Sequence, residues 1–442
     1  MVERSSSERY PGDGAPPRSR WTREHATRIE RTEETVAPII YPPESTPDRD
    51  VHVWDTWLMR DRHEQVAEVN GWRLAFSLTA PADLLPGKRH DVARIRCFAS
   101  RDGREWRSVG PAFDGGALGQ RQWAGSALYD EGDVYVYYTA AGEAGADELR
   151  YTQRIAGAAG GTVTATEQEF ALEGPWRHEI LLTPDGEHYE TESQSRGMIY
   201  TFRDPWFYQD PATGETTLLF EANTPVPEGS DLCGGNPEQQ TFNGCIGIAV
   251  STSGDPMSWE LRPPILDSVC VNQELERPHV VRWDGRYYLF VSSHKHTFAP
   301  GLSGYDGLYG FVADSLGGPY RPLNDSGLVL TNPANAPFQA YSWIVFPHDE
   351  ELLVEQFFNY YAYEGDSMDG VGNLPEAEQH RRFGGTLGPT IRLGVEDDRT
   401  RILGTLDHWR VPLPGESLPN PMPGERGGRP VVADSTPGDY TQ

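Results

Sequence analysis

The stretch His-Val-Val-Arg-Trp-Asp-Gly-Arg-Tyr-Tyr-Leu-Phe-Val, residues 279–291, contains two apolar runs joined by an Asp-Gly pair. Asp-Gly between alternating apolar runs is a strong signal for a β-hairpin, because both residues tolerate the positive φ angles of a tight turn. The same strand–turn–strand pattern recurs in three further stretches, which are Ala127–Thr139 with a turn at Asp130–Asp133, Trp206–Phe220 with a turn at Gln209–Glu215, and Thr390–Leu406 with a turn at Glu396–Arg399. The chain is therefore predicted to be all-β.

Helical periodicity is scarce, and no break in composition divides the body of the chain. We expect one domain over residues 46–418, a five-bladed β-propeller with a central active-site pocket, because a propeller leaves few exposed sheet edges. A large β-sandwich or a parallel β-helix is the alternative, but no short repeat of fixed length supports the helix. Residues 1–45 are predicted to form an extended or disordered arm, and residues 419–442 a Pro/Gly-rich tail.

The composition is strongly acidic. The chain of 442 residues has 66 acidic and 38 basic side chains, a formal charge of −28, and Lys88 and Lys295 are its only lysines. Such a surface repels nucleic acid and anionic lipid, so we expect neither as a partner. It is typical of proteins that stay soluble in concentrated salt, with an ordinary acidic mesophile as the alternative.

Neither a membrane span nor an ordinary export signal is visible. No run of about 18 apolar residues predicts a transmembrane helix, and residues 1–30 lack the apolar segment of a secretory signal. Cys233 and Cys245 flank a loop rich in Gly, Asn and Pro, and a disulfide between them is one hypothesis, with free thiols as the other. No ligand spacing nearby supports a zinc site.

Three short acidic segments stand out from the β pattern. They are Val53-Trp54-Asp55-Thr56-Trp57, Phe202-Arg203-Asp204-Pro205-Trp206 and Glu274-Leu275-Glu276-Arg277-Pro278. Since Asp and Glu are seldom buried without a partner, acids in apolar segments are candidate functional residues. Aromatic rings pack on the apolar faces of sugars, and two carboxyl groups can cleave a glycosidic bond by nucleophilic attack and proton transfer. The segments therefore indicate sugar chemistry.

Each acidic segment also has a purely structural explanation. Asp55 could cap a turn, Arg203-Asp204-Pro205 is a common turn tripeptide, and the segment around Glu276 could be a solvated edge strand. However, Glu274 and Glu276 alternate along a strand-like run, so they are expected on one face, where mutual repulsion would raise one of their pKa values. Three such segments in one β-rich chain favour function.

In this order, the three segments resemble the motifs of glycoside hydrolase family 68, the bacterial and archaeal levansucrases and inulosucrases. Shorter motifs agree, which are Gln122-Trp123-Ala124-Gly125-Ser126, Asp306-Gly307-Leu308-Tyr309-Gly310-Phe311 and Gly318-Pro319-Tyr320-Arg321-Pro322-Leu323-Asn324. The resemblance covers about residues 45–410. It implies a five-bladed propeller that transfers fructosyl units from sucrose, and the acidic, Lys-poor composition is similar to that of haloarchaeal members.

The resemblance also implies roles for individual residues. Asp55 would attack the fructosyl anomeric carbon, Glu276 would protonate the departing glucose and later deprotonate the acceptor, and Asp204 would hold fructosyl hydroxyls. Substrate contacts are implied for Trp54, Trp123 and Arg203 around the fructosyl unit, and for Glu274, Arg277, His294 and Tyr341 beside the glucosyl unit.

The sequence departs from the family pattern at three positions. Ala124 stands where many relatives have a Ser that touches the nucleophile, so that hydrogen bond must be absent or replaced. Gln273 stands where several relatives have a calcium-binding Asp, which puts structural calcium in doubt. His294 stands where some relatives use Arg, which would change the grip on the acceptor.

The leading hypothesis is a sucrose-dependent fructosyltransferase that forms fructan by double displacement, with sucrose hydrolysis alongside. An invertase-like hydrolase is the first alternative, although the Asn-Asp-Pro-Asn-Gly motif of such relatives is absent, and a non-catalytic carbohydrate-binding propeller is the second. The motifs do not separate β(2-1) from β(2-6) linkage, and the haloarchaeal resemblance favours inulin-type product. We expect sucrose and a fructan acceptor as partners, no cofactor or metal, a monomer, and an extracellular location.

Overall fold

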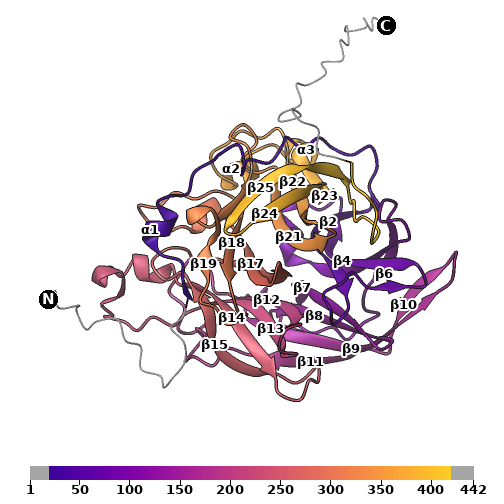
Figure 1. Cartoon of the computed structure of the whole chain (residues 1–442), viewed down its shortest axis with the longest axis horizontal. Coiled ribbons are helices and arrows are strands. Elements are labelled where there is room, and N and C mark those ends of the chain that lie inside the picture. Colours follow the sequence, from indigo (N-terminus) through magenta and orange to yellow (C-terminus); the bar gives the residue numbers. More distant parts are fainter. Residues whose placement is uncertain (1–18, 420–442) are drawn as a thin grey trace, which may run out of the picture.

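Five units of mainly antiparallel strands, or blades, surround a central axis in the computed structural model, which describes residues 19–419 (Figure 1). The colours in Figure 1 pass once around the ring from blade I to blade V, so the blades follow one another in chain order. The innermost strands β2, β7, β12, β16 and β21 are neighbours around the axis, and β21 lies next to β2 to close the ring. The chain is therefore a five-bladed β-propeller, as the sequence predicts.

The strands of each blade are as follows. Blade I contains β2 (Val51–Arg60), β3 (Glu68–Val69), β4 (Trp72–Pro81), β5 (Arg94–Ser100) and β6 (Arg107–Pro111). Blade II contains β7 (Arg121–Asp130), β8 (Asp133–Ala141), β9 (Gln153–Ala165), β10 (Phe170–Glu173) and β11 (Arg177–Leu182). Blade III contains β12 (Phe202–Gln209), β13 (Thr216–Asn223), β14 (Gly244–Ser251), β15 (Glu260–Asp267) and the N-terminal β1 (Ser19–Arg20).

Blade IV contains β16 (Glu276–Trp283), β17 (Arg286–Ser293), β18 (Gly307–Ala313), β19 (Arg321–Pro322) and β20 (Leu328–Thr331). Blade V contains β21 (Ala340–His348), β22 (Glu351–Tyr360), β23 (Phe383–Leu387), β24 (Pro389–Glu396) and β25 (Arg399–His408). The helices are short: α1 (Arg23–Ala26), α2 (Asp369–Gly372), α3 (Glu376–Arg382) and the 3-10 turns η1 (Pro86–Asp91), η2 (Leu232–Gly235), η3 (Gln239–Thr241), η4 (Lys295–Thr297) and η5 (Leu323–Asp325).

The four predicted hairpins are confirmed. They correspond to β7–β8, β12–β13, β16–β17 and β24–β25. In the β16–β17 hairpin, Trp283 pairs with Arg286 across the Asp284-Gly285 turn, where both turn residues have positive φ, 47° and 78°. Turn chemistry encoded in two residues therefore sets the register of the whole strand pair.

The two ends of the propeller differ in their connections. The second and third strands of each blade are joined by long connections, which are 82–93, 142–152, 224–243, 294–306 and 361–382. These lie where the innermost strands begin, because Val51 pairs with Pro81 and Arg121 pairs with Ala141. We call this the loop end. The opposite end carries tight turns such as 131–132, 284–285 and 397–398.

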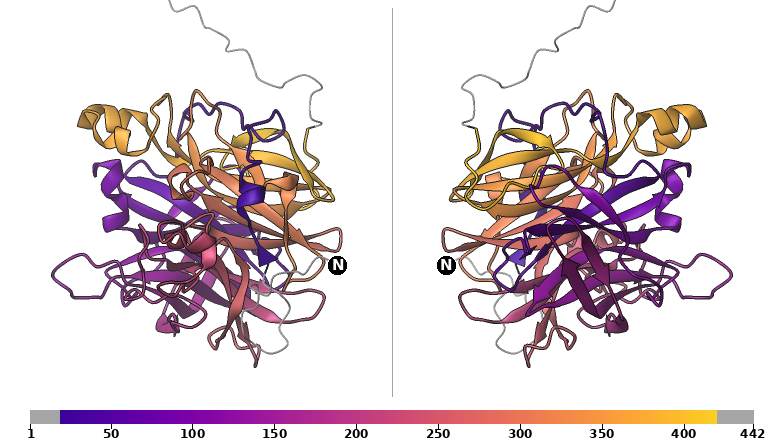
Figure 2. Two further views of the ribbon diagram at one scale, coloured as in Figure 1. Left: turned by 90° about the vertical axis from the view of Figure 1, so that its left-hand side faces the viewer. Right: turned by 90° about the vertical axis from the view of Figure 1, so that its right-hand side faces the viewer.

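The N-terminal segment lies along the outside of the propeller and reaches the loop end (Figure 2). The segment was expected to be extended or disordered over 1–45, and from residue 19 onward it is extended and packed. Trp21 is buried against Phe298, Tyr309 and Phe311 of blade IV, and its indole nitrogen donates to the carbonyl of Ser326 at 2.8 Å. Residues 1–18 and most of the predicted 419–442 tail lie outside the described residues.

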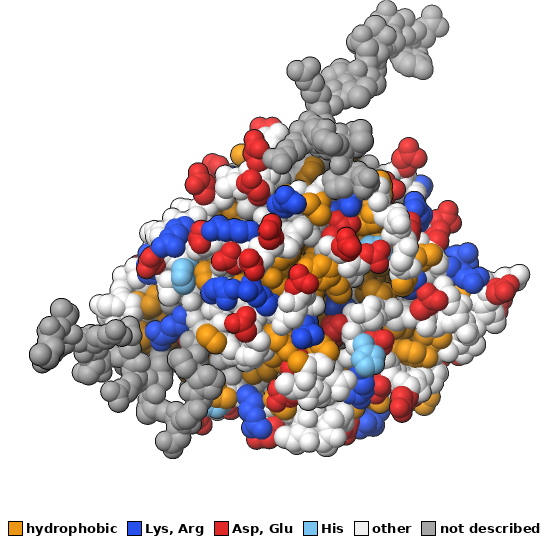
Figure 3. Space-filling model, viewed as in Figure 1, with side chains coloured by type: hydrophobic (Ala, Val, Ile, Leu, Met, Phe, Trp, Pro, Cys, Tyr) orange, Lys and Arg blue, Asp and Glu red, His pale blue; other side chains and the backbone are white. Residues whose placement is uncertain are grey.

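Acidic side chains are spread over the face seen in Figure 3, with basic side chains among them. Both signs of charge are thus mixed on that face. No described helix is long and apolar enough to cross a membrane.

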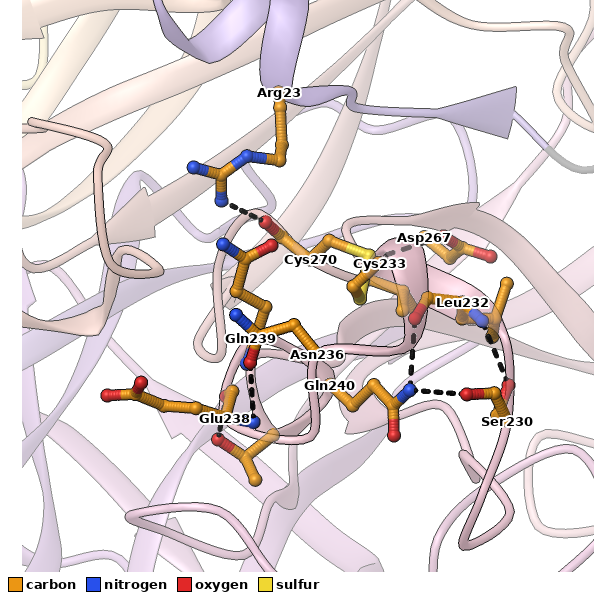
Figure 4. Close-up of a disulfide and its surroundings, with 12 residues drawn as sticks. Arg23, Ser230, Leu232, Cys233, Asn236, Glu238, Gln239, Gln240, Asp267 and Cys270 are labelled. Atoms are coloured by element: carbon orange, nitrogen blue, oxygen red, sulfur yellow. Dashed lines mark hydrogen bonds between the residues drawn. A yellow bond between two sulfur atoms is a disulfide. The ribbon is translucent and has the colours of Figure 1, made fainter.

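The predicted disulfide between Cys233 and Cys245 is wrong, because Cys233 is bonded to Cys270 (Figure 4). Cys245 is buried within β14, where it lies opposite Ala222, so its side chain belongs to the packed interior of blade III. Cys270 lies in the connection from β15 to β16, which reaches the loop end beside the 224–243 connection. Arg23 donates to the Cys270 carbonyl at 2.9 Å, so the N-terminal segment also contacts this connection.

Candidate functional site

A register shift interrupts each of the five innermost strands near the loop end, and in four of them the bulge begins at a non-Gly residue with positive φ. Asp55, Asp204, Arg277 and Ser342 each occupy the first position of such a bulge, with φ of 45°, 59°, 52° and 58°. A left-handed backbone at a non-Gly residue costs about 1–3 kcal/mol, and such strain is concentrated at functional sites. The bulges turn these side chains toward one another.

The three predicted catalytic acids converge at these bulges. The backbone amide of Arg277 donates to Asp204 Oδ2 at 3.0 Å, which joins the second and third acidic segments directly. Carboxylate oxygens of Asp204 and Glu276 lie within 4.8 Å of each other. The charges of Glu276 and Asp55 both act on Asp204, so three residues from three blades share one site.

Asp55 interacts with the positively charged guanidinium of Arg277 and with the hydroxyl of Ser342. Burial raises the pKa of Asp55, and the Arg277 guanidinium together with a hydrogen bond from Ser342 partly offsets that rise. Arg277 donates from Nη1 to Ser342 Oγ and from Nη2 to the Thr56 carbonyl, both at 2.7 Å. Ser342 therefore supplies a hydrogen bond to Asp55 where Ala124, which has no hydroxyl, cannot.

Arg203 is the centre of a buried charge network. Its Nε donates to Glu221 at 2.6 Å, and its Nη2 donates to Glu274 and to Glu276, each at 3.0 Å. The other oxygen of Glu221 accepts the backbone amide of Leu275 at 3.1 Å. Glu221 was not among the predicted residues, although a Glu inside the apolar run Leu218-Leu219-Phe220-Glu221-Ala222 was a usable signal.

His294 and Tyr341 stack beside Glu276. Their ring centroids are 3.7 Å apart with 6° between the planes, and the Tyr341 hydroxyl donates to Glu276 Oε2. His294 Nδ1 lies 3.0 Å from Asp306 Oδ2, and its Nε2 lies 3.7 Å from Glu276 Oε2. Burial lowers the pKa of His294, but Asp306 and the nearby glutamates outweigh it and raise the pKa to about 9.

The predicted aromatic residues line the other side of the site. Trp123 donates from its indole nitrogen to the His90 carbonyl at 3.2 Å, and the rings of Trp54 and His90 meet edge to face at 5.4 Å. Arg89 lies 5.5 Å from the Trp54 ring, and its charge acts on Asp55. Arg89 and His90, both in η1, were missed because nothing local in the 82–93 connection marks them.

Glu276 and His294 remain partly open to solvent, with side chains 19% and 21% exposed. Arg277 is 4% exposed and its guanidinium is engaged with protein groups. A molecule that reaches the site would therefore meet Glu276 and His294 before the more deeply buried Arg277 and Trp54.

The site has carboxylates that could bind a metal cation, but the positive charge of the Arg203 guanidinium already lies among them. Asp204, Glu221 and Glu276 have oxygens within 4.8 Å of one another, and Arg203 donates to two of these residues. Elsewhere at this end, Gln273 donates to the Ile199 carbonyl at 2.8 Å and accepts the Met198 amide at 3.0 Å. The neutral amide of Gln273 thus holds the 183–201 connection.

A five-bladed propeller with converging carboxylates and aromatic side chains at its axis is the architecture of a carbohydrate-active enzyme. A family model described as Levansucrase/Invertase matches residues 13–408. This chain therefore belongs to the levansucrase/invertase family, glycoside hydrolase family 68.

Known proteins agree with that assignment. A levansucrase from Erwinia amylovora is 35% identical over 427 residues, covering 89% of this chain and 96% of that protein. An extracellular sucrase from Zymomonas mobilis is 32% identical, covering 89% and 95%. Among solved structures, an inulosucrase from Halalkalicoccus jeotgali bound to kestose is 63% identical with a TM-score of 0.90, covering 91% of this chain and 99% of that one.

Proposed function

We propose that this protein is a sucrose-dependent fructosyltransferase that releases glucose and forms fructan. The single observation that carries the proposal is the meeting of Asp55, Asp204 and Glu276 at adjacent bulges, in a chain of this family. Two carboxyl groups acting as nucleophile and acid–base are what a retaining double displacement requires.

In the first half of the reaction, an oxygen of Asp55 attacks the anomeric carbon C2 of the fructosyl unit. The bond from C2 to the bridging oxygen breaks, and that oxygen takes the proton of the Glu276 carboxyl and leaves with glucose. In the second half, an acceptor hydroxyl gives its proton to Glu276, attacks C2 and breaks the ester to Asp55. Water in place of the sugar acceptor gives free fructose.

Asp204 is assigned to holding the fructosyl hydroxyls and stabilising positive charge at C2. Its backbone supports this role, because its amide donates to Thr139 Oγ1 at 2.9 Å while its carboxylate accepts the Arg277 amide, so the side chain is fixed from two sides. A charge held in place needs no reorganisation as the transition state forms.

Trp54, Trp123 and Arg203 are assigned to the fructosyl side, and Glu274, His294 and Tyr341 to the glucosyl side. Arg277 is assigned to positioning, since its guanidinium holds Ser342 and the Thr56 carbonyl beneath Asp55. The contact with the glucosyl unit that the resemblance implies for Arg277 stays a prediction beside this positioning role.

Sucrose turnover tests the proposal. The purified protein, incubated with sucrose in both low and multimolar salt, should release glucose in excess over fructose, because only transfer retains fructosyl units in product. Asp55→Asn should release neither sugar. Equal glucose and fructose would instead support the invertase-like alternative, and no release under any salt condition would exclude both.

We further propose inulin-type β(2-1) linkage and action outside the cell. The inulosucrase bound to kestose at 63% identity supports the linkage, and the extracellular sucrase supports the location. NMR of the product separates β(2-1) from β(2-6) linkages, and sucrase activity in the culture medium of the native producer tests the location.

A further inference from the structure

His279 is a completely buried imidazole at the junction between blades IV and V. It belongs to β16 and is 0% exposed. Its Nδ1 donates to the carbonyl of Arg277 at 2.8 Å, and its Nε2 accepts the backbone amide of Val345, also at 2.8 Å. A carbonyl only accepts and a backbone amide only donates, so these two contacts require the neutral ring with its proton on Nδ1.

The two backbone groups that the ring joins lie at two of the bulges of the site. Arg277 begins the bulge of β16, and Val345 lies three residues after Ser342, which begins the bulge of β21. Within residues 19–419, β16 and β21 belong to separate sheets, so a backbone hydrogen-bond ladder does not join them. The imidazole instead supplies a hydrogen-bonded link from one strand to the other.

The position of Arg277 relative to β21 affects two of the three acids. The Arg277 amide donates to Asp204 at 3.0 Å, and its guanidinium donates to Ser342 and to the Thr56 carbonyl. Ser342 in turn hydrogen-bonds Asp55. A shift of Arg277 against β21 would therefore move the partners of Asp204 and of the nucleophile at the same time.

The surroundings of His279 keep its ring neutral and fixed. Burial lowers its pKa to about 3 together with the charges of Arg60 and Arg277, against the opposing effect of the hydrogen bond to the Arg277 carbonyl. The indole of Trp206 and the ring of Phe290 pack near it, with centroid distances of 5.3 and 5.7 Å. The link between the two strands is thus intact around neutral pH.

We propose that His279 is a positioning residue for fructosyl transfer, which fixes the spacing between the bulges of blades IV and V and thereby places Asp204 and Asp55 around the substrate. This deepens the proposed function and rests on it. Because the ring is completely buried, it acts through Arg277 and Ser342 and not on the sugar itself. Such spacing matters because a misplacement of about 1 Å can cost about 100-fold in rate.

The kinetics of His279→Phe test the inference, because Phe keeps a ring of similar shape and loses both hydrogen bonds. We expect kcat on sucrose to fall about 10- to 100-fold while KM changes by less than about 3-fold. Arg277 and Ser342 both oppose the raised pKa of Asp55, so their displacement should also move the acidic limb of the kcat/KM profile upward. His279→Gln, whose amide offers one donor and one acceptor, should regain part of kcat.

Tyr189→Phe is the matched control. It also removes two backbone hydrogen bonds from one completely buried side chain, those with Ile248 and Arg262 of blade III, and leaves the bulges intact. All variants are compared at a temperature at which circular dichroism shows them folded, and His279→Gln decides by the same readouts if His279→Phe does not fold.

Two outcomes would overturn the inference. In the first, the His279 variants keep the kcat of Tyr189→Phe and an unshifted acidic limb. In the second, both variants lose the fold, which would assign His279 to stability alone. Absence of glucose release in the parent would instead overturn the proposed function.

Discussion

Glu221 and Arg203 form a buried ion pair in which Nε of Arg203 donates to Glu221 Oε2 at 2.6 Å. Because the other oxygen of Glu221 binds the backbone of Leu275, this pair connects the second acidic segment to the peptide between Glu274 and Glu276. Burial raises the pKa of Glu221, and Arg203 opposes that rise. Glu221 is thus a positioning residue for the acid–base group.

Glu221→Gln should reduce both activity and stability. The variant leaves Arg203 with one fewer negative partner, and breaking a buried pair costs about 3–5 kcal/mol. We expect a free energy of unfolding lower by about that amount, and kcat on sucrose lower by at least about 10-fold because Glu276 is displaced. Denaturant unfolding and steady-state kinetics measure the two effects.

The control for this change is Glu190→Gln. Glu190 is also buried, and it accepts a hydrogen bond from Asn243 at 3.1 Å without contacting the acids of the site. A loss of kcat in Glu190→Gln as large as in Glu221→Gln would show that general destabilisation, and not the link to Leu275, causes the effect.

Ser342→Ala tests whether Ser342 replaces the hydroxyl missing at position 124. A hydrogen bond to a charged group contributes about 1.5–3 kcal/mol, so kcat/KM should fall about 10- to 100-fold. The hydrogen bond favours ionised Asp55, so its removal should raise the pKa of Asp55 further and move the acidic limb of the pH profile upward. Adding Ala124→Ser to the Ser342→Ala variant should restore part of the rate, and an unshifted acidic limb would argue against the contact.

Titration of His294 should produce an alkaline limb in the pH profile of activity. Its pKa of about 9 means that the ring carries positive charge beside Glu276 at neutral pH and loses it as the pH rises through about 9. Because the pKa is raised by folding, the associated stability is fully present below about 6.5 and disappears through the same high-pH range. In His294→Arg the charge persists, so activity at pH 10 relative to pH 7 should exceed that of the parent. Parallel profiles would rule out His294 as the titrating group.

Loss of the Cys233–Cys270 bond should destabilise the chain. Closure of a loop with a sequence separation of 37 corresponds to about 4 kcal/mol in the chain-entropy model. Cys270→Ser should lower the thermal midpoint, and reductant should lower the midpoint of the parent but not of Cys270→Ser. An equal response of both proteins to reductant would point to an effect elsewhere.

Salt should increase both stability and activity. With a formal charge of −28, the folded chain repels itself, and screening at high ionic strength weakens that repulsion. We expect the thermal midpoint and the rate of glucose release to rise between about 0.1 M and 2 M salt. A maximum in salt-free buffer would contradict the halophilic interpretation.

The propeller could be predicted because its signals are local. The alternation of apolar residues and the Asp284-Gly285 turn specify a hairpin within a dozen residues, and the same pattern recurs along the chain. The acids Asp55, Asp204 and Glu276 were recognisable because a charged side chain within an apolar segment is rarely buried unless it has a partner or a function.

Other features depended on how separate segments meet in space. The bond of Cys233 to Cys270 joins two connections of blade III, and the place of Ser342 next to Asp55 depends on closure of the ring between blades V and I. Nothing within a short window of sequence encodes such a distance.

The alternation of apolar and polar residues, together with the turn residues, by itself determined the β-strands and the hairpins. The same local pattern marked the candidate acids, because strands, turns and burial follow from backbone preferences over a few neighbouring residues. Only the tertiary structure decided which side chain touches which acid, since closure of five blades around one axis brings residues far apart in the chain to within hydrogen-bonding distance.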